Sequence, residues 1–393
     1  MKILIAHNSY QHRGGEDAVV EAEAALLQQR GHEIEIYARH NDELHGMPAA
    51  AAALGAVWSS RSAAEVDRIC RRFRPDLIHV HNVFPLISPA LYWAAARLEI
   101  PVVQTLHNFR LVCPQAMLLR DGKICEDCVG KVPWRAVVRK CYRESTLQSA
   151  VSFCTLTMHR ALGTFNERIS RFIALNSFCR DKFIAGGLPA DRISVKPNFY
   201  ANDCFPQWAD RAGGLFAGRL SFEKGLDVLG AAAQSMSSCS VKVVGRGPLE
   251  EDVTSTFGRD YLGFRSQQEV VELLRQSLYL VAPSACYENF PLVVVEAFAS
   301  GTPVIASRHG SYAALVEDGV TGMLFAPGDA QELAQKIAWA DAHPEEMKQM
   351  GRRARAEYES KYTPAENYRL LMNIYHLALQ ESNGEQNAAR QVA

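Results

Sequence analysis

The sequence has no surplus of charge of either sign. Among its 393 residues, 42 Lys and Arg stand against 43 Asp and Glu, for a formal net charge of −1. Because a chain that binds nucleic acid through its overall charge carries a clear positive excess, this balance argues against a nucleic-acid partner. Hydrophobic residues at 48% and charged residues at 22% are typical of a globular protein and exclude global disorder.

Long hydrophobic runs are also missing. The first apolar run, Ile3–Ala6, is too short for the core of a signal peptide, and Ala49–Trp58 is about half of a bilayer span. These absences predict a cytoplasmic chain. Its ten cysteines would then be mostly reduced thiols, so a tight cysteine cluster would indicate a metal rather than disulfides.

Two short motifs are absent as well. Neither half of the chain contains the G-x-G-x-x-G fingerprint, which counts against a nicotinamide or flavin enzyme. No D-x-D stands near the end of a predicted strand, where it could hold a metal–diphosphate complex. We therefore expect no catalytic metal.

The sequence does contain an alternation of short apolar runs with helix-length amphipathic stretches, which is typical of a parallel sheet covered by helices. The alternation occurs in two series, which predicts an α/β protein with two Rossmann-like domains and a ligand cleft between them. The predicted strands are Lys2–Ala6, Glu33–Tyr37, Leu77–Val80, Val102–Leu106, Phe172–Leu175, Leu215–Ala217, Val241–Val244, Tyr261–Leu262, Leu278–Ala282, Pro303–Ala306 and Met323–Phe325.

Composition also predicts the domain boundaries. Residues 1–197 form a first domain, interrupted by a cysteine-bearing insertion at about 109–145. A linker over 198–212 lacks clear periodicity and leads into a second domain at 213–381, whose last helix can pack back on the first domain. The polar tail at 382–393 is expected to fray.

The segment Gly218–Gly225 follows the first strand of the second half. Its Arg219 and Lys224 stand at the carboxyl end of a parallel strand between glycines, and two cations there suit a diphosphate. A solvated strand-to-helix turn is an equal alternative on this motif alone. Gly245 lies in a similar turn after the next strand, and Gly15 precedes a helix whose first amides could bind an anion.

The most specific motif is a pair of carboxylates, Glu288 and Glu296, separated by seven residues. Pro291 suits the first turn of a helix, so the amides of Leu292 and Val293 would face phosphate oxygens. Glu296 would then accept hydrogen bonds from ribose, and Glu288 would reach a sugar hydroxyl from the preceding loop. The alternative is a surface Glu and an incidental first-turn Glu.

Gly218–Gly225 and the Glu288–Glu296 segment together resemble glycosyltransferase family 4, the GT-B group of retaining, nucleotide-sugar-dependent enzymes. The resemblance covers most of the chain. It implies two Rossmann-like domains facing across a cleft, a nucleotide diphosphate sugar as donor, and a glycan or lipid-linked acceptor in bacterial polysaccharide or lipopolysaccharide assembly. The chain departs from the family after Pro197, where Asn198-Phe199-Tyr200 replaces the usual Asn-Gly-Val, and no ligand role is carried to that segment.

The resemblance also implies residue roles. Arg219 and Lys224 would grip the diphosphate, Phe264 would border the base, and Gly15 would close on the diphosphate from the other domain. His107 would face the sugar, whereas His79 and His81 are expected to be structural. The expected catalytic residues are Glu288, His107, Arg219 and Lys224, and the expected donor-binding residues are Gly15, Arg219, Lys224, Gly245, Phe264, Asn289, Phe290, Leu292, Val293 and Glu296.

Two rival functions stay open. The same architecture also serves nucleotide-sugar epimerases and hydrolases, and turnover of donor without acceptor would favour these. The other rival is a non-catalytic partner protein that uses the cysteine-bearing insertion for interaction.

The insertion contains Cys113, Cys125, Cys128 and Cys141 in the pattern C-x11-C-x2-C-x12-C. A C-x2-C pair lets two thiolates bind one ion from a tight turn, and two flanking cysteines complete a tetrahedral structural zinc site. Four unligated thiols, disulfides and an iron–sulfur cluster are the alternatives.

The segment Lys131–Arg143 in the same insertion is both basic and aromatic. If it is helical, Arg135, Arg139 and Arg143 recur every four residues and form a basic stripe that could rest on anionic lipid. This would make the protein peripheral at the inner membrane surface. A solvated basic face over the core is an equal alternative.

Overall fold

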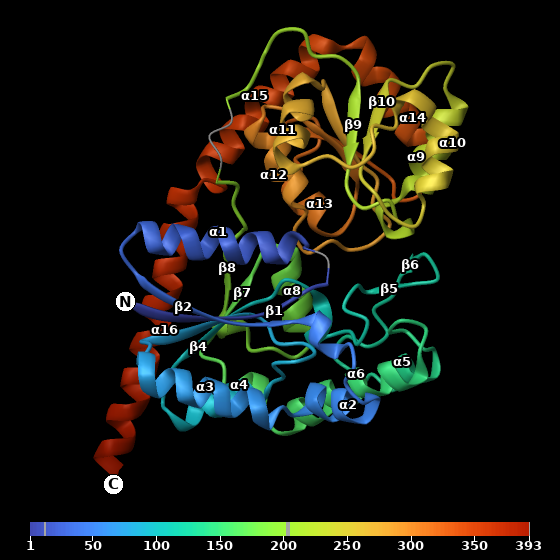
Figure 1. Ribbon diagram of the computed structural model, residues 1–393. Coiled ribbons are helices and arrows are strands. Elements are labelled where there is room, and N and C mark those ends of the chain that lie inside the picture. Colours follow the sequence, from blue (N-terminus) through green and yellow to red (C-terminus); the bar gives the residue numbers. More distant parts are fainter. Residues whose placement is uncertain (12, 202–204, 393) are drawn as a thin grey trace. The chain divides into compact units, whose positions relative to one another are not determined.

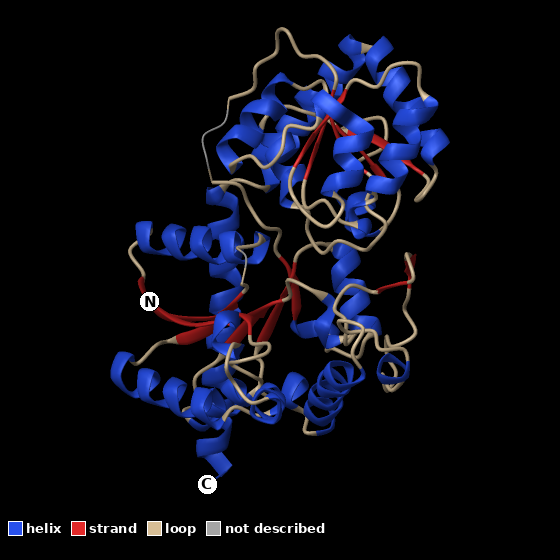
Figure 2. Ribbon diagram, turned by 45° about the vertical axis from the view of Figure 1, so that its right-hand side comes forward, coloured by secondary structure: helices blue, strands red, loops and turns tan. Residues whose placement is uncertain are grey.

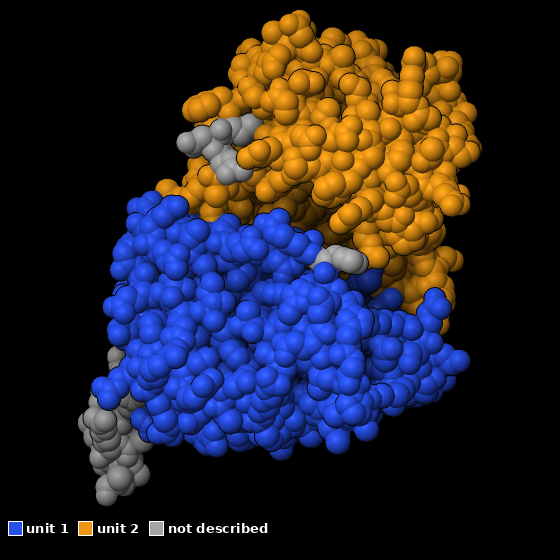
Figure 3. All heavy atoms as spheres, in the orientation of Figure 1, with its two compact units in different colours: residues 1–118, 125–197, 367–393 blue, residues 119–124, 198–366 orange. Residues whose placement is uncertain are grey.

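The chain forms two compact units, shown in different colours in Figure 3. The computed structural model describes residues 1–11, 13–201 and 205–392. Unit 1 contains Met1–Leu118, Cys125–Pro197 and the chain from Asn367 onward, and unit 2 contains Leu119–Ile124 and Asn198–Glu366. The short hairpin in residues 119–124 is thus grouped with unit 2, and most of the C-terminal helix is grouped with unit 1.

Unit 1 is built on a six-stranded parallel sheet with the strand order β2-β1-β3-β4-β7-β8 (Figure 1). Its strands are β1 (Lys2–Ser9), β2 (Glu33–His40), β3 (Leu77–Asn82), β4 (Val102–Thr105), β7 (Arg171–Ala174) and β8 (Ile193–Val195). The middle strands are buried along their whole length, so they read in the sequence as continuous apolar runs.

Helices flank the strands of this sheet (Figure 2). They are α1 (Gly15–Gln29), α2 (Ala49–Val57), α3 (Ser60–Phe73), α4 (Ala90–Arg97), α5 (Arg135–Val138), α6 (Thr146–Ala161), α7 (Thr164–Glu167), α8 (Ser177–Ala185) and α16 (Pro364–Val392). One core cluster joins α1 and α16 to the sheet, with Leu27 from α1 and Tyr375 from α16 packed with Ile5 of β1. Helix α16 therefore covers unit 1 although it follows unit 2 in the chain.

Unit 2 is built on a five-stranded parallel sheet with the order β10-β9-β11-β12-β13. Its strands are β9 (Gly214–Ala217), β10 (Val241–Val244), β11 (Tyr279–Ala282), β12 (Val304–Ser307) and β13 (Gly322–Phe325). Its helices are α9 (Leu226–Ser235), α10 (Glu250–Phe257), α11 (Gln267–Gln276), α12 (Leu292–Ala299), α13 (Gly310–Leu315), α14 (Ala330–Ala342) and α15 (Pro344–Lys361).

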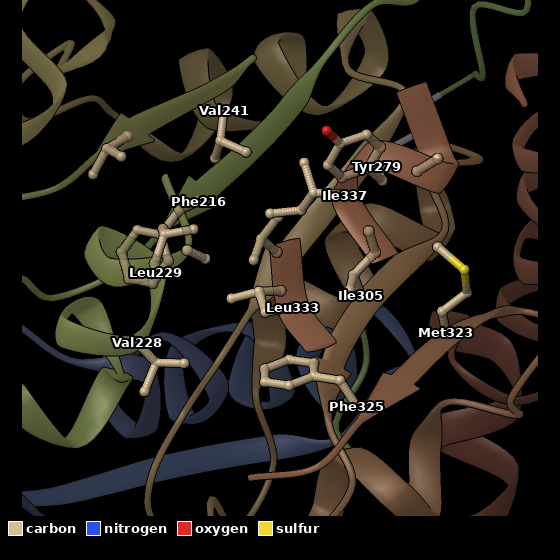
Figure 4. Packing of buried hydrophobic residues seen from close by; sticks show 14 of the residues in the cluster. Phe216, Val228, Leu229, Val241, Tyr279, Ile305, Met323, Phe325, Leu333 and Ile337 are labelled. Atoms are coloured by element: carbon tan, nitrogen blue, oxygen red, sulfur yellow. The ribbon is translucent and has the colours of Figure 1, made fainter. Parts of the chain in front are cut away.

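One core cluster of unit 2 forms an apolar layer between the sheet and helices such as α9 and α14 (Figure 4). Phe216 of β9 and Ile305 of β12 supply the sheet side, while Leu229 of α9 and Leu333 of α14 supply the helix side. All four side chains are at most 3% exposed. Packing of this layer holds the carboxyl ends of the strands, and the loops that follow them, in fixed positions.

The predicted α/β class with two parallel sheets is confirmed, and the predicted strands are found with one exception. Tyr261–Leu262 forms only an isolated bridge, between Tyr261 and Val243. The short strands β8, β5 (Leu119–Arg120) and β6 (Lys123–Ile124) were not predicted. Two or three residues are too few for the periodicity that identifies a strand in a sequence.

The end of the chain also differs from the prediction of a frayed tail over 382–393. Helix α16 continues to Val392, and residue 393 lies outside the described residues. Nor is any helix in the described part of the chain long and apolar enough to pass through a bilayer.

A buried charged network ties α1, β3 and α16 together in unit 1. The Lys196 side chain is fully buried, and its Nζ donates to Oε2 of Glu23 at 2.7 Å. Nδ1 of His79 lies 3.0 Å from the other oxygen of Glu23, and the hydroxyl of Tyr375 lies 2.8 Å from the same Nδ1. Burial raises the pKa of Glu23, but Lys196 and His79 outweigh burial and hold that pKa well below its usual value. This arrangement is consistent with the structural role expected for His79.

We expect Lys196→Ala to lower the free energy of unfolding by about 3–5 kcal/mol, because it leaves the Glu23 carboxylate buried without its cation. The exposed Arg71–Asp67 pair of α3, with 2.6 Å between Nε and Oδ2, is the matched control. Arg71→Ala should cost much less, because water screens an ion pair on the surface. Urea unfolding followed by circular dichroism measures both, and equal midpoints for the two variants would contradict the assignment.

Candidate functional site

The predicted donor-binding residues meet at one edge of the unit 2 sheet. Strands β9 and β11 are neighbours, and the chain leaves them toward opposite sides of the sheet, to β10 and to β12. In open parallel sheets, ligands bind at the carboxyl ends of the strands at such a switch point. The loops that flank it are Gly218–Gly225 after β9 and Pro283–Pro291 after β11.

Backbone contacts hold these loops together at positions where only glycine fits. Gly225 has φ 71°, and a Cβ placed on it would lie 1.9 Å from the carbonyl oxygen of Pro283. A Cβ on Gly245 would likewise lie 1.9 Å from the carbonyl oxygen of Gly218. Because both approaches exclude any side chain, these glycines allow the loops after β9, β10 and β11 to form one continuous surface.

Lys224 and Glu288 form an ion pair across the switch point. Nζ of Lys224 lies 2.6 Å from Oε1 of Glu288, and the side chains are 27% and 17% exposed. Burial disfavours the charged form of Lys224, but the Glu288 carboxylate outweighs burial and raises the pKa of Lys224 above its usual value. The structure thus brings together two residues that are 64 positions apart in the sequence.

Hydroxyl groups that the sequence did not indicate support this pair. Ser284 Oγ donates to Oε1 of Glu288 at 3.3 Å and lies 3.2 Å from the hydroxyl of Tyr312. Ser311, at the start of α13, donates to the backbone carbonyls of Glu288 and Asn289. Burial raises the pKa of the Tyr312 hydroxyl, so it stays protonated and can donate. Single Ser and Tyr residues outside any motif carry no sequence signal for such roles.

The second carboxylate, Glu296, lies in α12 and is 8% exposed. Its Oε1 accepts a hydrogen bond from Nε2 of Gln267 at 2.7 Å. Burial raises the pKa of Glu296, and the bond from Gln267 opposes that rise only in part. A buried carboxyl group of this kind favours ligands with hydroxyl groups.

The start of α12 differs by one residue from the expectation. Pro291 is the N-cap, with φ −74° and ψ 100°, and Leu292 and Val293 are the first two helical residues. Their amides therefore fall in the first turn, where a helix provides no acceptor of its own. Asn289 and Phe290, in the loop before the helix, are both buried.

The rim of this edge is exposed and carries a cation–aromatic contact. Phe264 is 60% exposed, and the guanidinium of Arg246 lies 4.7 Å from the centre of its ring. Arg219, in the loop after β9, is exposed. An exposed aromatic face beside guanidinium groups can stack on a planar base.

The other predicted residues, Gly15 and His107, lie in unit 1, at the carboxyl edge of its own sheet. Gly15 is the first residue of α1 and is exposed. Nε2 of His107 lies 2.9 Å from Nδ1 of His81, and burial lowers the pKa of His107 to about 3. His107 is consequently neutral at neutral pH and can offer hydrogen bonds but no charge.

Two carboxylates beside these residues were not predicted. Oε1 of Glu16 accepts from Nδ2 of Asn108 at 2.8 Å, and burial raises the pKa of Glu16. Oδ1 of Asp17 lies 2.8 Å from Nε2 of His7; burial raises the pKa of Asp17, but the hydrogen bond with His7 and the amide of Gly14 outweigh it. The signal that could have found them is their position directly after the Gly14-Gly15 pair, at a helix N-terminus.

The basic stripe predicted over Lys131–Arg143 is wrong. Helix α5 covers only Arg135–Val138, and Lys140 and Arg143 have positive φ angles of 51° and 52°. Arg135 and Arg139 both form ion pairs with Asp127. A helix of four residues cannot align basic side chains over three turns.

Two families match complementary parts of the chain. The family described as Glycosyl transferases group 1 matches residues 210–357, and the Glycosyl transferase 4-like domain matches residues 14–198. The D-inositol 3-phosphate glycosyltransferase of Saccharomonospora viridis is 30% identical over 79% of this chain and 72% of its own length. The sulfoquinovosyl transferase of Arabidopsis thaliana is 25% identical over 78% of this chain, but the match spans only 57% of that protein.

The solved structures show the same fold. The structure of Anabaena HepE in complex with UDP has a TM-score of 0.66 with this chain at 19% identity, and the match covers 95% of this chain and 99% of the other. The expected GT-B class is confirmed by this likeness together with the two parallel sheets.

We expect Gly225→Ala to lower the stability of unit 2 by roughly 2–4 kcal/mol, because the new Cβ meets the Pro283 carbonyl in a left-handed backbone conformation. Gly230→Ala is the control, since its Cβ would meet only Thr256 Cγ2 at 3.8 Å and α9 gains a better helix former. Thermal unfolding compares them. A Gly225→Ala variant as stable as Gly230→Ala would show that the two loops need no such approach.

Proposed function

This chain belongs to the glycosyl transferases group 1 family, and on that premise we propose that it moves a sugar from a nucleotide diphosphate sugar to an acceptor hydroxyl with retention of configuration. The observation that carries the proposal is the partly exposed Lys224–Glu288 pair at the switch point of the unit 2 sheet. A cation there faces a diphosphate, and a carboxylate there faces a sugar.

Charge stabilisation is the main catalytic task in this proposal. When the bond from the anomeric carbon to the diphosphate breaks, negative charge grows on the leaving phosphate oxygen. Arg219 and Lys224 supply positive charge there, and the amides of Leu292 and Val293 add the partial charge of a helix N-terminus. All four groups belong to unit 2, so no rearrangement within the sheet is needed to assemble them.

In this proposal Glu288 binds the transferred sugar of the donor, and Glu296 binds its ribose. Glu288 accepts hydrogen bonds from hydroxyls of the transferred sugar while it holds Lys224, and Asn289 and Phe290 shape that end of the site. Glu296, buried and with a raised pKa, binds the ribose hydroxyls together with Gln267. Gly245 lets the loop after β10 approach the diphosphate, and Phe264 stacks on the base.

Retention follows from attack on the same face of the sugar. The acceptor oxygen forms its bond to the anomeric carbon on the face from which the diphosphate departs, and the departing phosphate oxygen takes the acceptor proton. Glu288 is the one carboxylate that we would test as a covalent nucleophile. Its 2.6 Å contact with Lys224 favours a binding role, since an ion-paired carboxylate is a weaker nucleophile.

Unit 1 contributes the acceptor side in this proposal. His107 is neutral and donates or accepts a hydrogen bond at the sugar, and Gly15 presents its amide to the diphosphate. A glycan or lipid-linked acceptor in bacterial polysaccharide or lipopolysaccharide assembly fits the family. A nucleotide-sugar epimerase or hydrolase is the rival, and consumption of donor without any acceptor would favour it over transfer. A non-catalytic partner protein would turn over no donor at all.

We expect Arg219→Ala and Lys224→Ala each to lower kcat/KM. The loss of transition-state stabilisation should be about 2–4 kcal/mol, because each variant removes one preorganised charge partner of the leaving group. A donor assay with a panel of nucleotide sugars, beginning with UDP-sugars, measures this. The panel is chosen by thermal shift, since a donor at about a hundred times its Kd adds roughly 2.7 kcal/mol of stability.

Lys242→Ala is the matched control, because Lys242 is exposed on β10 and stands outside the site loops. The double variant Lys224→Ala/Glu288→Ala separates lost diphosphate contact from the cost of an unpaired Glu288. Full activity of Arg219→Ala or Lys224→Ala would remove that residue from the mechanism.

We further propose that unit 1 rests on anionic lipid through its insertion. Val132, Trp134 and Val138 are 55–70% exposed, and Lys131 and Lys140 stand beside them. Exposed apolar side chains next to lysines are typical of an interfacial lipid contact. This contact would bring the site to a lipid-linked acceptor.

In a co-sedimentation assay, the protein should pellet with anionic vesicles at about 50 mM salt and stay in the supernatant at about 500 mM, because salt screens the lysine–lipid attraction. Trp134→Ala should weaken binding, whereas Phe205→Ala, which removes an exposed aromatic side chain from unit 2, should not. Equal sedimentation with neutral and anionic vesicles would end the membrane proposal.

A further inference from the structure

The insertion gathers four cysteines in a stretch with little regular structure. Between β4 and α6 the chain forms the strands β5 and β6 of two residues each and the short helix α5. Cys113 and Cys128 are buried there, and Cys125 and Cys141 are partly buried. No disulfide joins any of the nine described cysteines. Something other than secondary structure must hold these loops.

One set of contacts joins the Cys125-x2-Cys128 turn to Cys141. Asp127 lies between Cys125 and Cys128 and forms ion pairs with Arg139 and, at 3.8 Å, with Arg135. Arg135 is the first residue of α5 and Arg139 directly follows the helix, and the amide of Cys141 donates to the carbonyl of Ala136 in α5 at 2.9 Å. The turn and the cysteine after α5 are therefore held against each other.

A second set joins Cys113 to the same place. Arg160 of α6 donates from Nη2 to the Leu111 carbonyl at 2.7 Å and from Nη1 to the Lys131 carbonyl at 3.1 Å. These carbonyls belong to the segments just before Cys113 and just after Cys128. One guanidinium thus clamps the two ends of the cysteine loop.

Electrostatics show the same proximity. Charges on Cys113, Cys125 and Cys141 act on Cys128, which is buried. Both Cys125 and Cys141 act on the guanidinium of Arg139, and Cys128 acts on that of Arg160. The four thiols therefore lie near one another in the insertion.

We propose that Cys113, Cys125, Cys128 and Cys141 bind one structural zinc ion as four thiolates. Binding forms four Zn–S bonds, and the four thiol protons pass to solvent. The resulting site carries a net charge of −2, which Arg139 and Arg160 partly neutralise from outside. Soft sulfur ligands in a set of four select zinc over magnesium or calcium.

Zinc binding requires the loops to bring the four sulfur atoms closer together. No three of the four sulfur atoms lie within 4.8 Å of one another; among the described residues only Glu23, His79 and His81 bring ligand atoms that close. That buried set holds the cation Lys196 and is not a metal site. The loops of the insertion, by contrast, have few backbone ladders to resist closure.

Elemental analysis of the full chain, purified without a His-tag or chelator, is the direct test. We expect about one zinc per chain. Cys125→Ser/Cys128→Ser should contain none, and Cys154→Ser, which removes an exposed cysteine of α6 outside the set, should contain as much as the wild type. A wild-type chain without metal that takes up no added Zn²⁺ would overturn the proposal.

Cobalt substitution keeps the test decisive if the double variant fails to fold. Wild-type protein in which Co²⁺ replaces zinc should show intense thiolate-to-metal charge-transfer bands, which four sulfur ligands produce and oxygen ligands do not. Iron with acid-labile sulfide in place of zinc, or an intact mass that shows two disulfides, would each overturn the assignment. Neither measurement depends on sugar transfer, so this proposal can fail while the proposed function stands.

Discussion

At the carboxyl edge of the unit 2 sheet, three loops approach one another so closely that no side chain fits between them. Gly225 meets the Pro283 carbonyl, and Gly245 and Gly247 meet the carbonyls of Gly218 and Leu220. The loops after β9, β10 and β11 therefore move as one body with the sheet. Because of this constraint, the positions of the charged side chains follow from the packing of the core. A side chain on any of these glycines would separate a cation from the carboxylate that it faces.

The chain uses the Lys–Glu pair in two different ways, and the difference is exposure. Lys196 and Glu23 in unit 1 are at most 1% exposed, so neither can exchange its partner without a large desolvation cost. Lys224 and Glu288 are 27% and 17% exposed, and water or a phosphate reaches them. The first pair holds α1 against the segment that follows β8. The Lys224–Glu288 pair can exchange part of its ion pairing for contacts with a ligand.

Periodicity and turn residues were enough to predict the two sheets, and the motifs pointed to residues that the fold places in the loops at one edge of the unit 2 sheet. The parts that failed are those decided by three-dimensional partners. Tyr261–Leu262 has the apolar pattern of a strand, but it forms only one bridge, between Tyr261 and Val243 of β10. The Tyr261 hydroxyl donates to the carbonyl of Gly245, in the loop after β10, at 3.0 Å. Lys131–Arg143 reads as a basic helix, but its backbone turns left-handed at Lys140 and Arg143.

Supporting residues are harder to predict than the residues they support. Ser284 and Ser311 donate to Glu288, and Tyr312 contacts Ser284. Nothing in the local sequence distinguishes these three from other polar residues. The sequence did not single out Glu16 either, because the neighbouring glycine pair indicated a role for backbone amides and not for a carboxylate. A carboxylate becomes conspicuous only when the fold shows that it is buried against Asn108.

The basic residues in and around the insertion fall into two groups, one near the cysteines and one near the exposed apolar side chains of the proposed lipid contact. Arg135 and Arg139 form ion pairs with Asp127, which lies between Cys125 and Cys128, and Arg160 donates to the backbone carbonyls of Leu111 and Lys131. Lys131 and Lys140 remain exposed beside Val132, Trp134 and Val138. The lipid contact thus depends on side chains that the cysteine cluster does not use. It also depends on that cluster indirectly, because a segment with one turn of helix can present Trp134 in a fixed direction only if the loops on either side of it are fastened.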